Sequence, residues 1–367
     1  MYAAAGEQID AAAEALASVN AALGDLEREK LSPPAPPTDV SELVAELRRW
    51  RPEDLTACPA ASPLRVLTLR ELLTLELPTR EHLLAPWLSR QGLAMIYAQR
   101  GVGKTFFALN VAYAVATGSS FLRFRAPQPR RVLIIDGEMP AVVLQQRLAR
   151  IAASACNEPP NDDYLRLLPA DVQSEALPDL ATGAGQKRIE PYLDDVELLI
   201  LDNISTLCRT GVENEAEGWA AVQAWALALR RRGISALFLH HAGKNGAQRG
   251  TSKREDVLDT VIVLRRPSDY DPRQGARFEV HFDKTRGLIG DDAAPFEAML
   301  EVDAGGRDVW TVASLDAKEV ERVATMQHAG LSQRDIAKEL NISLGKVNRL
   351  SKLGRGEASN GARDFVS

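Results

Sequence analysis

The chain has 367 residues, enough for two or three domains, and its 45% apolar and 26% charged residues are typical of a globular protein. The formal net charge of −6 gives no global signal for nucleic acid or a membrane surface, although it is compatible with a local basic patch. Cys58, Cys156 and Cys208 form no CxxC pair, so neither a zinc site nor a disulfide framework is expected. No apolar run approaches the roughly 18 residues of a membrane span, and we expect a cytoplasmic protein with no membrane partner.

The first part of the chain, residues 1–86, is predicted to be a helical segment. Apolar residues recur every seven positions between residues 7 and 31, which predicts either a short coiled coil or a helix packed on the rest of the fold. A proline-rich stretch at 32–38 predicts a stiff extended linker. Residues 40–90 are expected to be helical and irregular.

A glycine-bearing loop then follows the apolar run 93–97 and leads into a helix that starts near Phe106. Strand, loop and helix in this order are the setting of a P-loop, in which backbone N–H groups and the helix N-terminus hold phosphates. Lys104 would reach the β and γ phosphates of ATP, and Thr105 would hold Mg²⁺. Ala98 stands where the fuller pattern has Gly, which removes some backbone freedom. The expected nucleotide-binding residues are Ala98, Gln99, Arg100, Gly101, Val102, Gly103, Lys104, Thr105 and Phe106.

From residue 87 to 313, short apolar runs alternate with helical patterns. Continuous apolar runs fit strands that are buried on both faces, as in a parallel sheet, so the pattern predicts an α/β fold with a mainly parallel sheet. Helices are expected through 144–151 and around 219–232. Further strands are expected at 131–136, 198–202, 236–240, 260–264, 278–282, 296–302 and 309–312.

Two acids follow strands of this sheet, where ligands of open α/β folds bind. Asp202 ends an apolar strand, as a Mg²⁺-side acid should. Glu138 lies just past the strand after the P-loop helix, where a carboxylate could position the attacking water. The alternative for Glu138 is an acid that stabilises a helix N-terminus.

Basic residues gather on two later loops. A loop after the 236–240 strand begins with His241, which could either contact the γ-phosphate or hydrogen-bond at the sheet edge. The cations suit phosphates of nucleotide or DNA, although loop charges are often merely solvated. They are Lys244, Arg249, Lys253 and Arg254 on this loop, and Lys284 with Arg286 on the next.

Residues 314–367 predict a small all-α module with a polar tail. Helices are expected at 320–328, 332–340 and from Ser343 through Leu350, with apolar spacing typical of a helix-turn-helix. The alternative is a helical tail with no role in DNA binding. Lys346 and Arg349, on the candidate recognition helix, are the predicted contacts to duplex DNA.

The order of these motifs resembles the RecA-like replicative helicases of superfamily 4, most closely the plasmid RepA-type hexameric helicases. The resemblance covers roughly residues 87–313. It rests on Ala98–Thr105, Val132–Pro140 with Gln145–Leu148, Leu199–Ser205, Phe238–Lys244, Arg249–Ser252 and Lys284.

The resemblance implies a ring of six subunits with ATP and Mg²⁺ between neighbours and single-stranded DNA in a central channel. It implies that Glu138 is the catalytic carboxylate and His241 the sensor. It further implies that Arg249 is a finger supplied to the neighbouring subunit, assisted by Lys284 or Arg286. Lys244, Lys253 and Arg254 would then face the DNA. A C-terminal helix-turn-helix is not expected of a minimal RepA-type enzyme.

Three functions remain open at this point. The first is an ATP-driven DNA helicase of a plasmid, phage or other mobile replicon. The second is a RecA-like ATPase that does not unwind DNA, such as a DNA-bound regulator or replication initiation factor. The third, a scaffold that binds ATP without turnover, is disfavoured by Glu138 and Arg249.

Overall fold

The computed structural model describes residues 65–77, 80–210, 215–242, 256–340 and 342–361, and the chain divides into two compact units, Met1–Thr79 and Arg80–Ser367. In the first unit, helix α3 (Leu69–Thr74) begins at Thr68, whose side chain forms a capping box with Glu71. The helix expected at 7–31 and the linker at 32–38 lie outside the described residues. Within the described part, no helix is long and apolar enough to cross a membrane.

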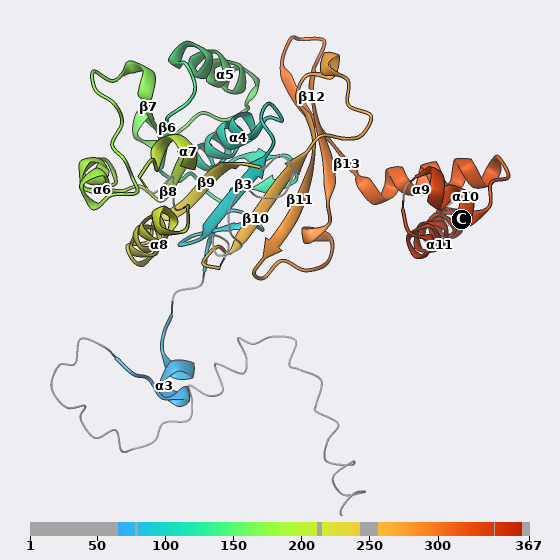
Figure 1. Ribbon diagram of the computed structural model, residues 1–367, viewed down its shortest axis with the longest axis horizontal. Helices are drawn as coiled ribbons and strands as arrows, with labels where there is room; N and C mark the ends of the chain where they lie inside the picture. The colour runs from blue at the N-terminus through green and yellow to red at the C-terminus, as the bar shows by residue number, and fades with distance from the viewer. Residues whose placement is uncertain (1–64, 78–79, 211–214, 243–255, 341, 362–367) are drawn as a thin grey trace, which may run out of the picture. The chain divides into compact units, whose positions relative to one another are not determined.

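The second unit is built around a sheet of nine strands (Figure 1). These strands are β3 (Leu93–Ala98), β6 (Val132–Asp136), β7 (Leu165–Pro169), β8 (Leu198–Asp202), β9 (Ser235–His241), β10 (Thr260–Arg265), β11 (Arg277–Thr285), β12 (Phe296–Val302) and β13 (Asp308–Ser314). Their order is β13-β12-β11-β10-β3-β9-β8-β6-β7. The six strands from β10 to β7 are parallel, and β11, β12 and β13 extend the sheet in antiparallel fashion.

Helices cover both faces of the parallel part. They are α4 (Lys104–Thr117), α5 (Ala141–Ser154), α6 (Gly183–Ile189), α7 (Ile204–Leu207) and α8 (Glu215–Arg231). Short 3-10 helices lie at Asp162–Tyr164, Ala170–Val172, Glu190–Tyr192, Pro272–Gln274 and Gly290–Ala293.

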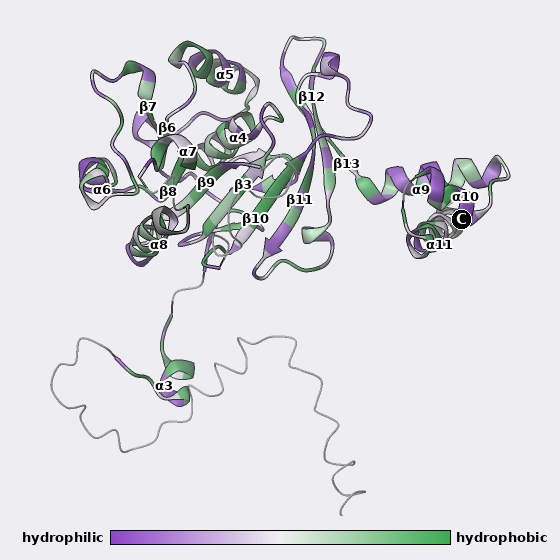
Figure 2. Cartoon of the chain, in the orientation of Figure 1, coloured by the Kyte–Doolittle hydropathy of each residue, from purple (hydrophilic) through white to green (hydrophobic). Residues whose placement is uncertain are grey.

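Alternate residues of β3 explain why its sequence is continuously apolar. Ala94, Ile96 and Ala98 belong to a core cluster that includes the buried residues of α4. Leu93, Met95 and Tyr97 belong to a second cluster, which includes the apolar side of α8. A strand buried on both faces needs apolar residues at every position, and hydrophobic residues indeed follow the central strands (Figure 2). The predicted α/β class with a mainly parallel sheet is confirmed.

The expectation that residues 40–90 are helical and irregular was wrong for the part just before β3. The strands β1 (His82–Leu84) and β2 (Leu88–Ser89) pair with each other there, and Ala85 bridges to Arg125. Arg125 ends β5 (Phe124–Arg125), which pairs with β4 (Ser120–Phe121). This tertiary pairing overrides local propensity. These short strands belong to the second compact unit, which begins at Arg80.

Three helices follow the sheet. Helix α9 (Leu315–His328) starts directly after β13, and α10 (Gln333–Glu339) and α11 (Leu344–Gly361) complete the group. Ser332 caps α10, as its position predicted. The three helices share a small core of their own, formed by Val323, Ile336, Val347 and Leu350.

Candidate active site

The P-loop and the predicted acids meet at one edge of the sheet. In the parallel register Ala98 of β3 lies beside His241 of β9, and Asp136 of β6 lies beside Asp202 of β8. These residues are the carboxyl ends of their strands. The topology thus brings together groups that lie far apart in the sequence, at the edge of the sheet where ligands of open α/β folds bind.

The loop between β3 and α4 has the backbone of an anion cradle. Gly101 and Gly103 have φ angles of 75° and 118°, a region that residues with a Cβ rarely adopt. Gly103 precedes α4 and gives it no side-chain cap, so the first N–H groups of the helix are available to an anion. The Nζ of Lys104 donates to the carbonyl oxygens of Ala98 at 3.0 Å and Gln99 at 3.2 Å. Burial lowers the pKa of Lys104, and Asp202 and Glu138 oppose that shift.

Arg266 supports the same loop and was not anticipated from the sequence. Its Nη2 donates to the carbonyl oxygen of Gly101 at 3.0 Å, and its guanidinium carbon lies 4.8 Å from the ring centroid of Tyr270. Arg266 follows β10, the neighbour of β3. No motif marks it, because its role depends on which strands are adjacent.

Thr105 and Asp202 fit a site for Mg²⁺ bound together with a nucleotide. The Thr105 hydroxyl is close enough to Asp202 to oppose the rise in the pKa of that carboxyl, and Oδ2 of Asp202 is buried without a hydrogen-bond partner among the described residues. Mg²⁺ commonly takes one or two protein ligands and fills its shell with water and phosphate. In the described ranges no group of three or more His, Cys, Asp or Glu could hold a metal.

The buried carboxyl of Asp202 should make stability depend on pH. Burial, followed by the charges of Asp136 and Glu138, raises its pKa from 3.8 to about 7. A raised pKa in the folded state contributes stability that is full below about pH 4 and lost as the pH rises through about 7. Asp202→Asn should therefore gain stability over the parent with rising pH, by on the order of 4 kcal/mol at full ionisation.

Thermal unfolding without nucleotide and Mg²⁺, from pH 5 to 8.5, measures this effect. The exposed Asp195→Asn serves as the control and should follow the parent. A Tm difference between Asp202→Asn and the parent that stays constant across this range would show that the carboxyl is not the cause.

Glu138, Asn203 and His241 form a hydrogen-bonded group beside the P-loop. Asn203 Nδ2 donates to Glu138 Oε2 and lies 3.2 Å from His241 Nε2, which is itself 3.3 Å from Glu138 Oε2. The Asn203 side chain is fully buried, and its Oδ1 accepts the N–H groups of Ser205 and Thr206. Burial lowers the pKa of His241, which favours the neutral ring, although Glu138 acts in the opposite direction. Asn203 was not predicted from the sequence, although it is a polar residue directly after the strand that ends at Asp202.

The turn that carries Glu138 is fixed by Asp136. Oδ1 of Asp136 accepts the N–H groups of Glu138 at 2.9 Å and Met139 at 2.8 Å. Helix α5 begins only at Ala141 and has no acid in its first turn. The geometry therefore favours a carboxylate directed to the site over one that stabilises the helix N-terminus.

Four of the other predicted basic residues lie away from the P-loop. Lys284 and Arg286 are at the amino edge of the parallel sheet, since Thr285 pairs with Thr260, the first residue of β10. On α11, Lys346 and Arg349 form ion pairs with Glu319 and Asp316 of α9, at 2.7 and 3.2 Å. The remaining four, Lys244, Arg249, Lys253 and Arg254, lie outside the described residues.

Comparison with known proteins gives one family match. No curated protein matches the chain. Among solved structures, a KaiC-like protein from the hyperthermophilic archaeon Pyrococcus horikoshii OT3 is similar, with 15% identity, a TM-score of 0.41, and coverage of 61% of this chain and 90% of that one. The family model described as AAA domain matches residues 59–247, which is more than half of the chain and includes the P-loop, Glu138 and Asp202. The chain therefore belongs to the AAA domain family of P-loop ATPases.

Proposed function

We propose that the protein is an ATP-driven, helicase-like DNA motor of a plasmid, phage or other mobile replicon. The observation that carries the hydrolytic part is the contact of Glu138 with Asn203 and His241 at the sheet edge that holds Lys104 and Thr105. A scaffold that binds ATP without turnover would not need a carboxylate held in this way.

Each residue of the site has a defined task in hydrolysis. The P-loop N–H groups and Lys104 would bind the phosphates. Thr105 with Asp202 would hold Mg²⁺, which would supply positive charge beside the phosphate oxygens. Glu138 orients the attacking water and accepts its proton. Asn203 fixes Glu138 and links it to His241, so a change at the γ-phosphate can be passed to the loop after β9.

The proposal places the nucleotide between neighbours in a ring, as a hexamer. Support comes from the separation between Arg286 and its own P-loop. Arg286 lies near the start of β3, whereas the P-loop follows the end of that strand, roughly 17 Å away for a strand of this length. A cation that cannot reach its own nucleotide is suited to act on a neighbour's, together with Arg249. Lys244, Lys253 and Arg254 would contact single-stranded DNA in the channel.

Strand displacement on forked DNA, with ATP and Mg²⁺, tests the motor. The proposed function requires unwinding by the parent and none by Lys104→Ala. DNA-stimulated ATP hydrolysis without unwinding would instead support the second candidate, a DNA-bound regulator or initiation factor.

The C-terminal helices favour that second candidate as well, since a three-helix group with its own core suits a separable reader of duplex DNA. A chain ending at Ser314 should keep assembly and ATP hydrolysis, because Val323, Ile336, Val347 and Leu350 pack mainly on one another. It should lose preference for duplex DNA of its own replicon.

Duplex binding by the full and shortened chains over a salt series checks this prediction. Several copies on a ring would raise the effective affinity of a weak single module, so the difference should be largest for the assembled protein. Equal binding by both chains would mean that the helices do not read DNA.

A further inference from the structure

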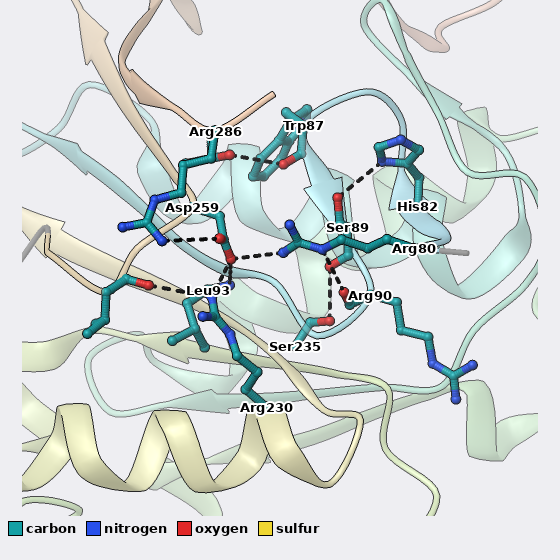
Figure 3. Close-up of polar contacts among 12 residues, drawn as sticks. Arg80, His82, Trp87, Ser89, Arg90, Leu93, Arg230, Ser235, Asp259 and Arg286 are labelled. Atoms are coloured by element: carbon teal, nitrogen blue, oxygen red, sulfur yellow. Dashed lines mark hydrogen bonds and ion pairs between the residues drawn. The ribbon is translucent and has the colours of Figure 1, made fainter. Parts of the chain in front are cut away.

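A single carboxylate at the amino edge of the sheet gathers three arginines (Figure 3). Asp259, whose side chain is 12% exposed, accepts hydrogen bonds on Oδ2 from Arg80 at 3.0 Å and from Arg230. Its Oδ1 lies 4.0 Å from Nη1 of Arg286. Oδ2 also accepts the N–H of Leu93 at 3.0 Å, which ties the group to the first residue of β3.

Around Asp259, three arginine side chains share one carboxylate, so positive charge exceeds negative charge. Among the described residues, Arg80, Arg230 and Arg286 form no ion pair other than that with Asp259. Burial lowers the pKa of Arg230; Asp259 opposes this shift, and repulsion by Arg80 and Arg286 adds to it. The neighbouring network is balanced, with two arginines on two carboxylates: Arg90, Arg130, Glu81 and Glu197. Three cations on one anion leave a surplus that an anion from outside would relieve.

Two of the guanidinium groups are open to such an anion. The side chains of Arg80 and Arg286 are 46% and 51% exposed, and Arg230 lies behind them at 27%. Their own P-loop is at the opposite end of β3, so the anion must come from another molecule.

We propose that Asp259 is a positioning residue for Arg286. It holds Arg80, Arg230 and Arg286 as one preformed cationic group that receives the phosphates of a nucleotide bound by a second copy of this chain. Without the carboxylate the three like charges would repel one another and disperse, and Arg286 would lose its placement. The inference rests on the proposed function, because it requires ATP hydrolysis between neighbours.

The test uses the full chain with Asp259→Asn, which removes the charge but keeps an oxygen for the N–H of Leu93. ATP affinity and assembly should match the parent, while kcat should fall about 10- to 100-fold, the scale of a misplaced catalytic group. The matched control is Glu197→Gln, which alters an arginine-binding carboxylate at the same edge and should keep the parent rate.

Mixtures separate positioning from a structural role. Asp259→Asn mixed with Lys104→Ala should recover activity, because intact P-loops then face intact arginine groups. A mixture of Asp259→Asn with Arg286→Ala should not recover activity. A single chain that carries both Asp259→Asn and Arg286→Ala should hydrolyse ATP no more slowly than Arg286→Ala alone. A parent rate for Asp259→Asn, or no recovery with Lys104→Ala, overturns the inference.

If Asp259→Asn does not fold, Asp259→Glu gives the same decision: slow turnover with recovery in the mixture supports the inference, and a parent rate overturns it. Failure of the proposed function is a different result, since the parent itself would then not hydrolyse ATP, or Glu138→Gln would hydrolyse it equally fast.

Discussion

Glu138→Gln is expected to bind ATP as the parent does and to hydrolyse it about 10²- to 10⁴-fold more slowly, the usual contribution of a general base. The amide keeps the size of the carboxylate and can still meet Asn203 and His241, so the site should keep its shape. It cannot accept a proton from water at neutral pH. Single-turnover hydrolysis together with equilibrium binding of ATP measures the two effects separately.

Two further variants serve as comparisons for Glu138→Gln. Lys104→Ala should lose both binding and turnover, because the charge that faces the phosphates is removed. Glu190→Gln, at an acid that pairs with Arg232 on the other edge of the sheet, should match the parent in both. Hydrolysis by Glu138→Gln at the parent rate would remove Glu138 from the mechanism.

The parallel part of the fold was predictable because a strand that is buried on both faces has a continuous run of apolar residues in the sequence. A strand such as β8 has five buried residues and no polar position before Asp202, so its run of leucine and isoleucine can be recognised locally. β7 has no continuous apolar run, because it is the last strand of the sheet and all five of its residues are only partly buried. The pairs β1–β2 and β4–β5 have strands of two or three residues, too short for any period.

Some residues of the active site could also be predicted from the sequence, whereas the contacts between them could not. The P-loop is a contiguous motif, and Glu138 and Asp202 could be located because each follows a recognisable strand. Their contacts could not be predicted: Asn203 meets Glu138 across 65 positions of sequence. The arginines around Asp259 could not be predicted from the sequence either, because Arg80 is separated from Asp259 by 179 positions and no spacing rule connects them.

Arg286→Ala is expected to bind ATP normally and to lose up to about 10³-fold in kcat, at the lower end of what an arginine finger contributes. The reason is that its guanidinium lies near the start of β3 and has no access to the P-loop of its own subunit. Mixing Arg286→Ala with Lys104→Ala should restore part of the activity. In mixed rings some intact P-loops of the first variant face intact arginines of the second, although neither variant is active alone.

The recovery should depend on composition in a way that only an interface can produce. It should be greatest near equal amounts of the two variants and absent in a mixture of Arg286→Ala with Arg249→Ala if both residues serve the same neighbouring site. The mixture of Arg249→Ala with Lys104→Ala tests in parallel the finger that the helicase resemblance implies. If subunits are shown to exchange and activity does not return, Arg286 acts within its own subunit or on DNA alone, and a nucleotide shared between neighbours loses its main structural argument.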